Sequence, residues 1–158
     1  MFTKALVAWQ TGDVDNAQLH FETLVDEFGS TDNGKIAHYW LGLIAYNTGN
    51  SESSEEYLKK YIKFGKEGLL IPNAYRLLAN LSIFKEDFEK AHTYFKKAIK
   101  FSIGKIEETN HKLNLAEFYL IWKRVEEAKA MIIPILEMKD LSSSLKTRAE
   151  ELSGKLKS

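Results

Sequence analysis

Histidine and carboxylate side chains are the groups in this 158-residue chain whose types could support chemistry. The four histidines are His20, His38, His92 and His111. No two of them lie three or four residues apart, so no single helix presents a pair of metal ligands. The chain has no cysteine, which excludes a thiol nucleophile, a cysteine zinc site and disulfides. The sequence therefore indicates neither a metal centre nor a bound cofactor.

Acidic residues occur in four adjacent pairs, Glu55-Glu56, Glu107-Glu108, Glu126-Glu127 and Glu150-Glu151. The two members of each pair point in different directions on a helix, so we interpret them as solubilising charges. Glu55 with Lys59, and Glu56 with Lys60, have the spacing of helical ion pairs that contribute about 0.2–0.5 kcal/mol each. The sequence contains no glycine-rich phosphate loop and no serine nucleophile elbow. We therefore expect no catalytic activity.

The overall charge is zero, with 22 basic and 22 acidic residues. This balance argues against a general nucleic-acid-binding protein, which normally carries a basic surplus. No apolar run approaches the roughly 18 residues of a membrane span, and no signal peptide is recognisable. Phe2, Leu6 and Trp9 already have helical spacing at the start of the chain. This pattern suggests a piece of a longer protein whose upstream part, such as a membrane anchor, is missing.

An internal repeat of 37 residues is the strongest pattern, first visible between YLKKYIKF (57–64) and YFKKAIKF (94–101). Equivalent positions in the four units form two columns of small residues and two columns of larger ones. The small columns are Ala5, Gly42, Ala79, Ala116 and Ala17, Ser54, Ala91, Ala128; the large columns are Lys4, Leu41, Leu78, Leu115 and Phe21, Leu58, Phe95, Ile132. Small residues at matching heights allow two antiparallel helices to cross closely.

Each unit therefore predicts a pair of helices. The expected spans are 2–11 and 14–28, 33–48 and 51–65, 72–84 and 87–102, and 107–122 and 125–138. Asn33 is predicted to cap the third helix, and Pro72 suits a first helical turn. Gly12 and Gly49 are expected to reverse the chain in a left-handed conformation, whereas Glu86 and Lys123 fill the same column in the later turns.

The last segment lies outside the repeat and predicts one further helix over 142–157. Leu145, Ala149, Leu152 and Leu156 form its thin apolar stripe, and three serines, Ser142, Ser143 and Ser144, supply caps. We expect residues 1–140 to form four repeats, at about 1–30, 31–68, 69–104 and 105–140. Residues 141–158 then form a capping helix over the open face of the last repeat. Pro134 predicts a bend or an early end of the eighth helix.

The motifs of these units resemble the tetratricopeptide repeat family. They are Tyr39-Trp40-Leu41-Gly42, Tyr46 to Asn50, Leu77-Leu78-Ala79, Phe88-Glu89-Lys90-Ala91, Phe95 and Ala98. The period of 37 exceeds the family's usual 34 or so, and the family's closing proline is replaced by Gly29, Lys66, Ile103 and Asp140. The resemblance implies an all-α, right-handed superhelix that binds other proteins and has no enzymatic role.

A narrower resemblance links Phe21 to Val25, Phe28 to Ser30 and Ala37 to Gly42 with repeat domains of the bacterial cell envelope. These domains belong to proteins of the ancillary translocon-subunit type and the Tol–Pal coordinator type. The resemblance implies a chaperone-like or scaffold module in the periplasm or at the inner membrane, and it leaves the cytoplasm open as a location.

In this family the first helix of each pair lines a concave groove, so the resemblance also indicates where a partner binds. The expected groove residues are Trp9, Tyr39, Leu43, Tyr46, Asn73, Arg76, Asn80, Asn110 and Glu117. We expect an extended or helical peptide whose apolar side chains meet the aromatic rings, while Arg76 and the asparagines hold its backbone or an acidic group. The alternative is that several of these rings pack inside the protein.

Two further hypotheses concern the protein's outer surfaces. Six aligned lysines, Lys59, Lys60, Lys63, Lys96, Lys97 and Lys100, could form a basic ridge for an anionic membrane or an acidic partner. They could equally be a solvated face with cations toward the helix C-termini. A functional rival to partner binding is self-assembly into homo-oligomers through the apolar edge at Phe2, Leu6 and Trp9. Binding of a small ligand is a third, weaker hypothesis.

Overall fold

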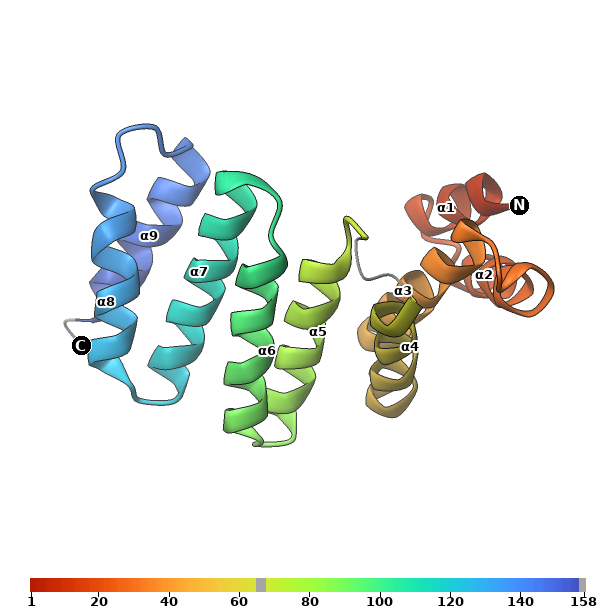
Figure 1. The fold of residues 1–158 in the computed structure, drawn as a ribbon, viewed down its shortest axis with the longest axis horizontal. Coiled ribbons are helices and arrows are strands. Elements are labelled where there is room, and N and C mark those ends of the chain that lie inside the picture. The colour runs from red at the N-terminus through yellow and green to blue at the C-terminus, as the bar shows by residue number, and fades with distance from the viewer. Residues whose placement is uncertain (65–67, 157–158) are drawn as a thin grey trace. The chain divides into compact units, whose positions relative to one another are not determined.

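The computed structural model describes residues 1–64 and 68–156, and the regular secondary structure in those ranges is entirely helical (Figure 1). Nine helices lie within the described ranges: α1 (Phe2–Gln10), α2 (Val14–Phe28), α3 (Asp32–Asn47), α4 (Ser51–Phe64), α5 (Ile71–Phe84), α6 (Phe88–Phe101), α7 (Gly104–Ile121), α8 (Val125–Leu136) and α9 (Ser143–Lys155). They follow one another along the chain as four pairs and a final single helix. The prediction of an all-α fold is confirmed.

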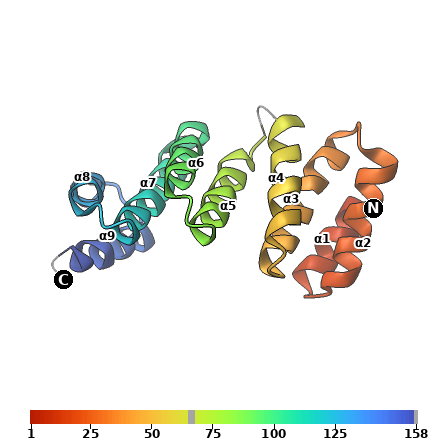
Figure 2. The same ribbon diagram turned by 90° about the horizontal axis from the view of Figure 1, so that it is seen from below.

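The chain forms two compact units, Met1–Leu81 and Ser82–Ser158. The first unit contains α1 to α4 and most of α5, and the second contains the end of α5 with α6 to α9. In the first unit α1 packs beside α2, and α3 packs between α2 and α4, as Figures 1 and 2 show from two directions. In the second unit α7 packs against α6, α8 and α9.

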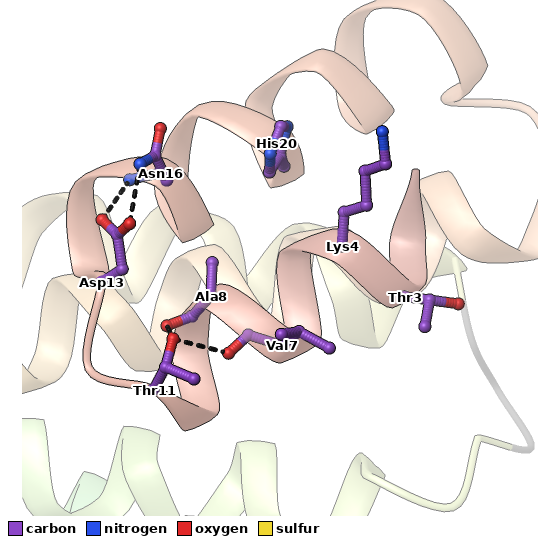
Figure 3. A pocket seen from close by; sticks show the side chains of 8 residues that line it. All are labelled: Thr3, Lys4, Val7, Ala8, Thr11, Asp13, Asn16 and His20. Carbon is purple, nitrogen blue, oxygen red and sulfur yellow. Dashed lines mark hydrogen bonds between the residues drawn. The ribbon is translucent and has the colours of Figure 1, made fainter.

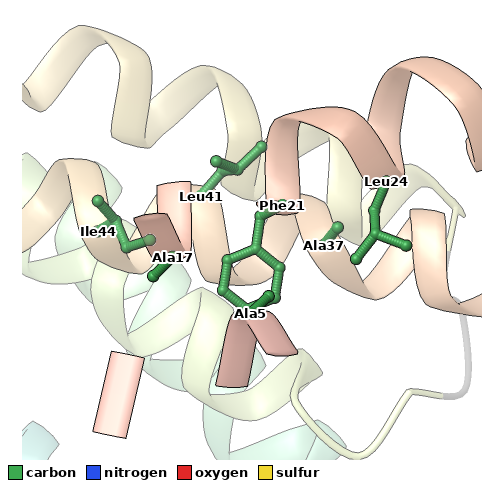
Figure 4. Packing of buried hydrophobic residues seen from close by; sticks show 7 residues of the cluster. All are labelled: Ala5, Ala17, Phe21, Leu24, Ala37, Leu41 and Ile44. Atoms are coloured by element: carbon green, nitrogen blue, oxygen red, sulfur yellow. The ribbon is translucent and has the colours of Figure 1, made fainter. Parts of the chain in front are cut away.

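The core of the first unit is built where α2 meets α1 and α3 (Figure 4). Its fully buried members are Ala5, Ala17, Phe21, Leu24, Ala37, Leu41 and Ile44. The Phe21 ring lies parallel to the Trp40 ring with centroids 5.8 Å apart, and its other neighbour is the edge of Phe2 at 6.0 Å. The large and small columns of the repeat therefore contribute to this core, except at Lys4, which is exposed.

The crossing of α3 and α4 shows why one column must contain small residues. The buried Ser54 hydroxyl donates a hydrogen bond of 2.8 Å to the carbonyl oxygen of Gly42. A Cβ atom added at Gly42 would lie 2.8 Å from Cγ of Leu58, a side chain with no exposed surface. The two helices are therefore too close at this point for any larger residue to fit without movement.

The second unit is packed by the same columns of the repeat and ends with α9. Ala116, Ala128 and Ile132 have no exposed surface, so the crossing of α7 and α8 is also lined by the predicted columns. Helix α9 packs on α7 and α8 and buries the predicted stripe, with Leu145, Ala149 and Leu152 at 7%, 0% and 2% exposure. The predicted capping-helix residue Lys157 lies outside the described residues.

The turns inside the helix pairs share one backbone conformation. Gly12 and Gly49 both have φ of +80°, as expected for a reversal that favours glycine. Glu86 and Lys123 occupy the same left-handed region, with φ of 57° and 58°. That conformation costs a residue with a side chain roughly 1–2 kcal/mol. These turns therefore keep the glycine geometry without the glycine.

Several predicted helix ends are wrong by a few residues. Helix α3 begins at Asp32, and the Thr31 hydroxyl, not the Asn33 side chain, accepts the capping hydrogen bond from the Gly34 backbone at 3.1 Å. Gly34 lies in the first turn of this helix, against the Phe28 carbonyl. Helix α7 begins at Gly104, three residues earlier than predicted.

The ends of α8 and α9 also differ from the expected spans. Helix α8 ends at Leu136, two residues earlier than the predicted 138 and two residues after Pro134. Ser142 occupies the N-cap position of α9, but its side chain makes no capping hydrogen bond and instead lies 3.3 Å from the Ser144 hydroxyl. The predicted serine cap is therefore wrong, although the helix starts where the serines occur.

Replacing Gly42 with alanine tests the close crossing of α3 and α4. We expect Gly42→Ala to lower the free energy of unfolding by about 1–3 kcal/mol, because the new methyl group overpacks against Leu58. The control is Gly154→Ala in α9, where the added Cβ meets no atom within 4 Å. That change should raise stability by about 0.5–1 kcal/mol, the usual helix preference for alanine. Urea denaturation of both variants would contradict the idea if Gly42→Ala were stabilising as well.

Candidate functional site

A groove of about 890 Å³ lies within the first unit, bounded by α1, α3, the end of α4 and the segment 68–70. Its lining is mostly apolar. The lining residues are Phe2, Leu6, Asp32, Lys35, Ile36, Trp40, Tyr61, Phe64, Gly68, Leu69 and Leu70. Such a volume lies within the range of pockets that hold small ligands or the side chains of a peptide.

Two of the apolar side chains at the groove are strongly exposed. Phe64, the last residue of α4, has 47% of its surface exposed, and Leu69 has 74%. Trp40 lies between the groove and the core, because its ring is stacked on Phe21 and is 6.4 Å from the Trp9 ring. The groove therefore combines a fixed indole ring with side chains that gain burial when something covers them.

Tyr61 forms the rigid edge of the groove next to the segment 68–70. Its side chain is 2% exposed, and its hydroxyl accepts a hydrogen bond from the Leu70 backbone N–H. Burial raises the pKa of this hydroxyl, and the hydrogen bond partly opposes the rise. A Cβ at Gly68 would collide with the Tyr61 hydroxyl, so only glycine lets the chain pass there.

Charged side chains are few at the groove. Asp32 and Lys35 form an exposed ion pair with 3.5 Å between Oδ1 and Nζ. An exposed pair of this kind contributes little to stability because water and salt screen it. Both charges are therefore available to a bound partner at little cost.

Polar side chains of α5 face the hydroxyl groups of α3. The Asn80 side-chain amide donates a hydrogen bond of 3.3 Å to the Tyr46 hydroxyl. Burial raises the pKa of the Tyr39 hydroxyl, and the positive charge of nearby Arg76 acts in the opposite direction. Arg76 and Asn80 are both half-buried, so they retain surface for a further contact.

None of the nine predicted groove residues lines this groove, so their role in binding a partner stays a prediction. Trp9, Leu43, Tyr46, Asn73, Arg76 and Asn80 are all half-buried in the first unit. The expectation that Tyr39 is accessible is wrong, because this residue is 5% exposed and its ring packs on Trp40 and Tyr61 at 5.6 Å each. The alternative, that some of the rings belong to the core, holds for Tyr39.

The apolar residues that line the groove were all absent from the predicted set: Phe2, Leu6, Ile36, Trp40, Phe64, Leu69 and Leu70. Ile36 and Trp40 are four residues apart on α3, so a helical apolar pair was a visible signal. Phe64 and Leu69 flank the connection between α4 and α5, and their positions depend on the path of that connection.

Asn110 and Glu117, the predicted groove residues of the second unit, already have partners within the chain. The Arg148 guanidinium of α9 donates to Asn110 Oδ1 at 2.8 Å, to Asn114 Oδ1 at 2.7 Å and to Glu117 Oε2 at 3.0 Å. These polar groups of α7 therefore help to hold α9 in place.

The predicted lysine ridge is divided between the two units. The expected ion pairs of α4 are present, with Lys59 2.6 Å from Glu55 and Lys60 2.7 Å from Glu56. Lys63 and Lys100 lie in the last turns of α4 and α6, where the helix dipole favours a cation. Lys96 and Lys97 are exposed on α6. A ridge formed by all six lysines stays a prediction.

The histidines lie in separate environments. His92 is 2.9 Å from the Tyr119 hydroxyl, and the buried His111 is 3.3 Å from the Asn114 amide. His38 is 6% exposed, its ring lies 5.4 Å from that of Phe64, and its Nδ1 has no hydrogen-bond partner in residues 1–64 and 68–156. Over those same ranges, no three potential ligands gather into a metal site, and no helix could cross a membrane.

The outer face of α1 forms a second, shallower hollow of about 480 Å³ against the start of α2 (Figure 3). Val7 at this face is 51% exposed, whereas its repeat equivalents Ile44, Leu81 and Phe118 are 1–3% exposed. Lys4 replaces the buried leucine of the later units. This face of the first repeat is therefore open where the later repeats are covered.

Comparisons with known proteins agree with this architecture. The tetratricopeptide repeat family matches at residues 2–68 and again at residues 72–102, together more than half of the sequence. The chain is a tetratricopeptide repeat protein. Repeats of this family generally serve as protein–protein interaction modules and are typically non-catalytic.

The tetratricopeptide fold also appears in a similar solved structure, TTC0263, a thermophilic TPR protein in Thermus thermophilus. The match has a TM-score of 0.70 and 19% sequence identity, and it covers 94% of this chain and 77% of that one. Identity at this level supports the fold alone. No curated protein gave a significant match.

The buried His38 should make this tetratricopeptide protein less stable in acid. Burial lowers the pKa of His38, and the nearby Lys60 charge lowers it further. The unfolded chain therefore takes up a proton near the ordinary pKa of about 6.5, before the folded chain does, so stability falls as the pH drops below that value.

The variant His38→Phe cannot take up this proton. We expect its free energy of unfolding to decline less steeply between about pH 7 and pH 5 than that of the parent. The slope is the decisive quantity, because any packing effect of the new ring is the same at every pH. Equal slopes for parent and variant would show that His38 is not responsible.

Proposed function

We propose that the first unit binds a peptide segment of a partner protein, in extended or helical form, in the groove between α1, α3 and the segment 68–70. The exposure of Phe64 and Leu69 beside the fixed Trp40 ring is the observation that carries this proposal. Apolar side chains of a peptide would bury this surface, and that burial would drive binding.

Polar groups at the groove rim give this binding its orientation, and the α5 side chains Arg76 and Asn80, which do not line the groove, would add to it where the peptide extends along α3. Arg76 offers a guanidinium to an acidic side chain or a carbonyl oxygen of the peptide, and Asn80 offers its amide. Asp32 and Lys35 stand at the rim, where their weak ion pair exchanges readily for contacts to a partner. The preferred peptide is therefore apolar with an acidic group to one side.

Peptides selected from a displayed random library on the parent protein provide the probe. We expect the selected sequences to be rich in large apolar residues and to bind Leu69→Glu at least about tenfold more weakly, because a carboxylate replaces apolar contact area. The control is Leu19→Glu, which changes a 57% exposed leucine of α2 outside the groove. Peptides that bind Leu69→Glu and Leu19→Glu equally well would contradict the proposed groove.

The polar side chains of α5, which lie outside the groove lining, need their own variant. The double change Arg76→Glu with Asn80→Ala alters half-buried side chains without opening a core cavity. We expect the same selected peptides to lose affinity, most strongly those with an acidic residue, since Arg76→Glu repels it. Unchanged affinity would place the bound peptide on another surface.

A second candidate function is self-assembly through the outer face of α1. The exposure of Val7, at a position that is buried in α3, α5 and α7, favours it. Light scattering across a concentration series should then show a mass that rises with concentration in the parent and stays constant in Val7→Glu. A parent mass that stays at that of one chain would contradict this candidate. Lys4 weighs against it, because a charge replaces leucine in the middle of the same face.

The finer description as a scaffold or chaperone-like module of the bacterial envelope rests on the resemblance over residues 21–42. The groove is compatible with either role, since both require recognition of a segment of another protein. The family matches support protein binding in general and are silent on the compartment.

A further inference from the structure

The connection between α6 and α7 presents an exposed apolar and basic surface that peptide binding by the first unit does not use (Figure 1). Ile103 is 58% exposed and Ile106 is 72% exposed, although isoleucine is among the residues most often buried. Lys100 precedes Ile103 and Lys105 lies between the two isoleucines, and both lysines are exposed. We call Lys100, Ile103, Lys105 and Ile106 the α6–α7 tip.

The α6–α7 tip carries two positive charges, and the Glu107 carboxylate lies beside it. Neither Lys100 nor Lys105 has an ion-pair partner in the part of the chain that the structure describes. Glu108 pairs with Lys112, whereas Glu107 accepts a hydrogen bond of 2.6 Å from the Ile103 backbone N–H and keeps its negative charge, so the local excess is one positive charge. A partner that covers the α6–α7 tip would therefore need negative charges next to an apolar region.

The position of the isoleucines distinguishes between kinds of partner. Ile103 lies in the two-residue link after α6, and Ile106 lies in the first turn of α7, so both are at the end of a helical hairpin. A hairpin end can enter an apolar layer without needing a surface of matching shape. Lysines next to the apolar residues match the headgroups of anionic lipids, whose surface potential attracts cations.

We propose that the α6–α7 tip is a membrane-contact site that binds the surface of an anionic lipid bilayer. Ile103 and Ile106 enter the boundary between headgroups and acyl chains, and Lys100 and Lys105 bind lipid phosphates. The contact is peripheral and reversible, because two isoleucines and two lysines supply far less binding energy than a spanning helix.

Co-sedimentation with vesicles tests the membrane contact on the whole chain. One set of vesicles is phosphatidylcholine alone, and the other is phosphatidylcholine mixed with phosphatidylglycerol. We expect binding to the anionic vesicles only, weakening as salt is raised. Sedimentation that is the same with both kinds of vesicle, or absent from both, would overturn the proposal.

Two pairs of variants separate the tip from the rest of the surface. Ile103→Ser with Ile106→Ser should lower the partition coefficient by about tenfold or more, since each isoleucine loses its burial in the bilayer. Its control is Ile121→Ser with Ile133→Ser, which changes two isoleucines of the same unit that are 54% and 42% exposed. Equal loss in both double variants, or no loss in the first, would overturn the proposal.

The lysines have a control of equal charge. Lys100→Glu with Lys105→Glu should abolish binding to anionic vesicles, whereas Lys123→Glu with Lys129→Glu changes the net charge by the same amount at exposed positions after the opposite end of α7 and on α8. If both double variants lose binding alike, the net charge of the protein and not the tip is responsible, and the proposal is wrong. Binding of the parent to an acidic apolar peptide but not to vesicles would assign the tip to a protein partner instead.

Discussion

The close approach of two helices at one crossing point is the constraint on which each pair depends. At Gly42 and Ser54 the backbones are near enough for a side-chain hydroxyl of one helix to donate to a carbonyl oxygen of the other. A crossing this close brings Leu58 against Gly42 and leaves no space for a methyl group. Ala5, Ala17, Ala116 and Ala128, all without exposed surface, keep the same compact geometry in the other pairs. The larger columns then fill the space on either side, as close packing requires.

The same crossing determines which side chains of the first helix in a pair belong to the core and which remain available to contact a partner. Leu41 and Ile44 of α3 are used by the core, so Ile36 and Trp40 on the adjoining stripe of the helix reach the groove. Trp40 belongs to both regions, because its ring stacks on the buried Phe21 while it also lines the groove. A change in the core around Phe21 would therefore move the groove wall. Stability and binding are coupled in the first unit through this ring.

The sequence was sufficient for the helix pairs but not for the groove. A period of 37 residues repeats the packing positions, so buried columns such as Phe21 and Leu58 could be predicted without coordinates. The period does not report the chain's path between pairs, which is why Phe64 and Leu69 were missed. Tyr39 was misplaced because a position equivalent to the half-buried Phe2 becomes buried once Tyr61 packs beside it. Asn33 was misplaced because a helix start depends on which hydroxyl or amide reaches the free N–H groups, here Thr31.

Equivalent positions of the repeat predict in which direction a side chain points, but they do not predict what that side chain contacts. Asn80 of α5 and Glu117 of α7 are equivalent by the repeat. Asn80 contacts the Tyr46 hydroxyl and is half-buried, whereas Glu117 joins Asn110 and Asn114 in binding Arg148. A guanidinium has five N–H donors, and three of the acceptors it needs are supplied by α7. A partner that used those α7 groups would have to replace Arg148 and uncover the apolar stripe of α9, including Leu152 at 2% exposure. Binding at α5 requires no such loss, and this difference favours the first unit over α7 in the proposed peptide binding.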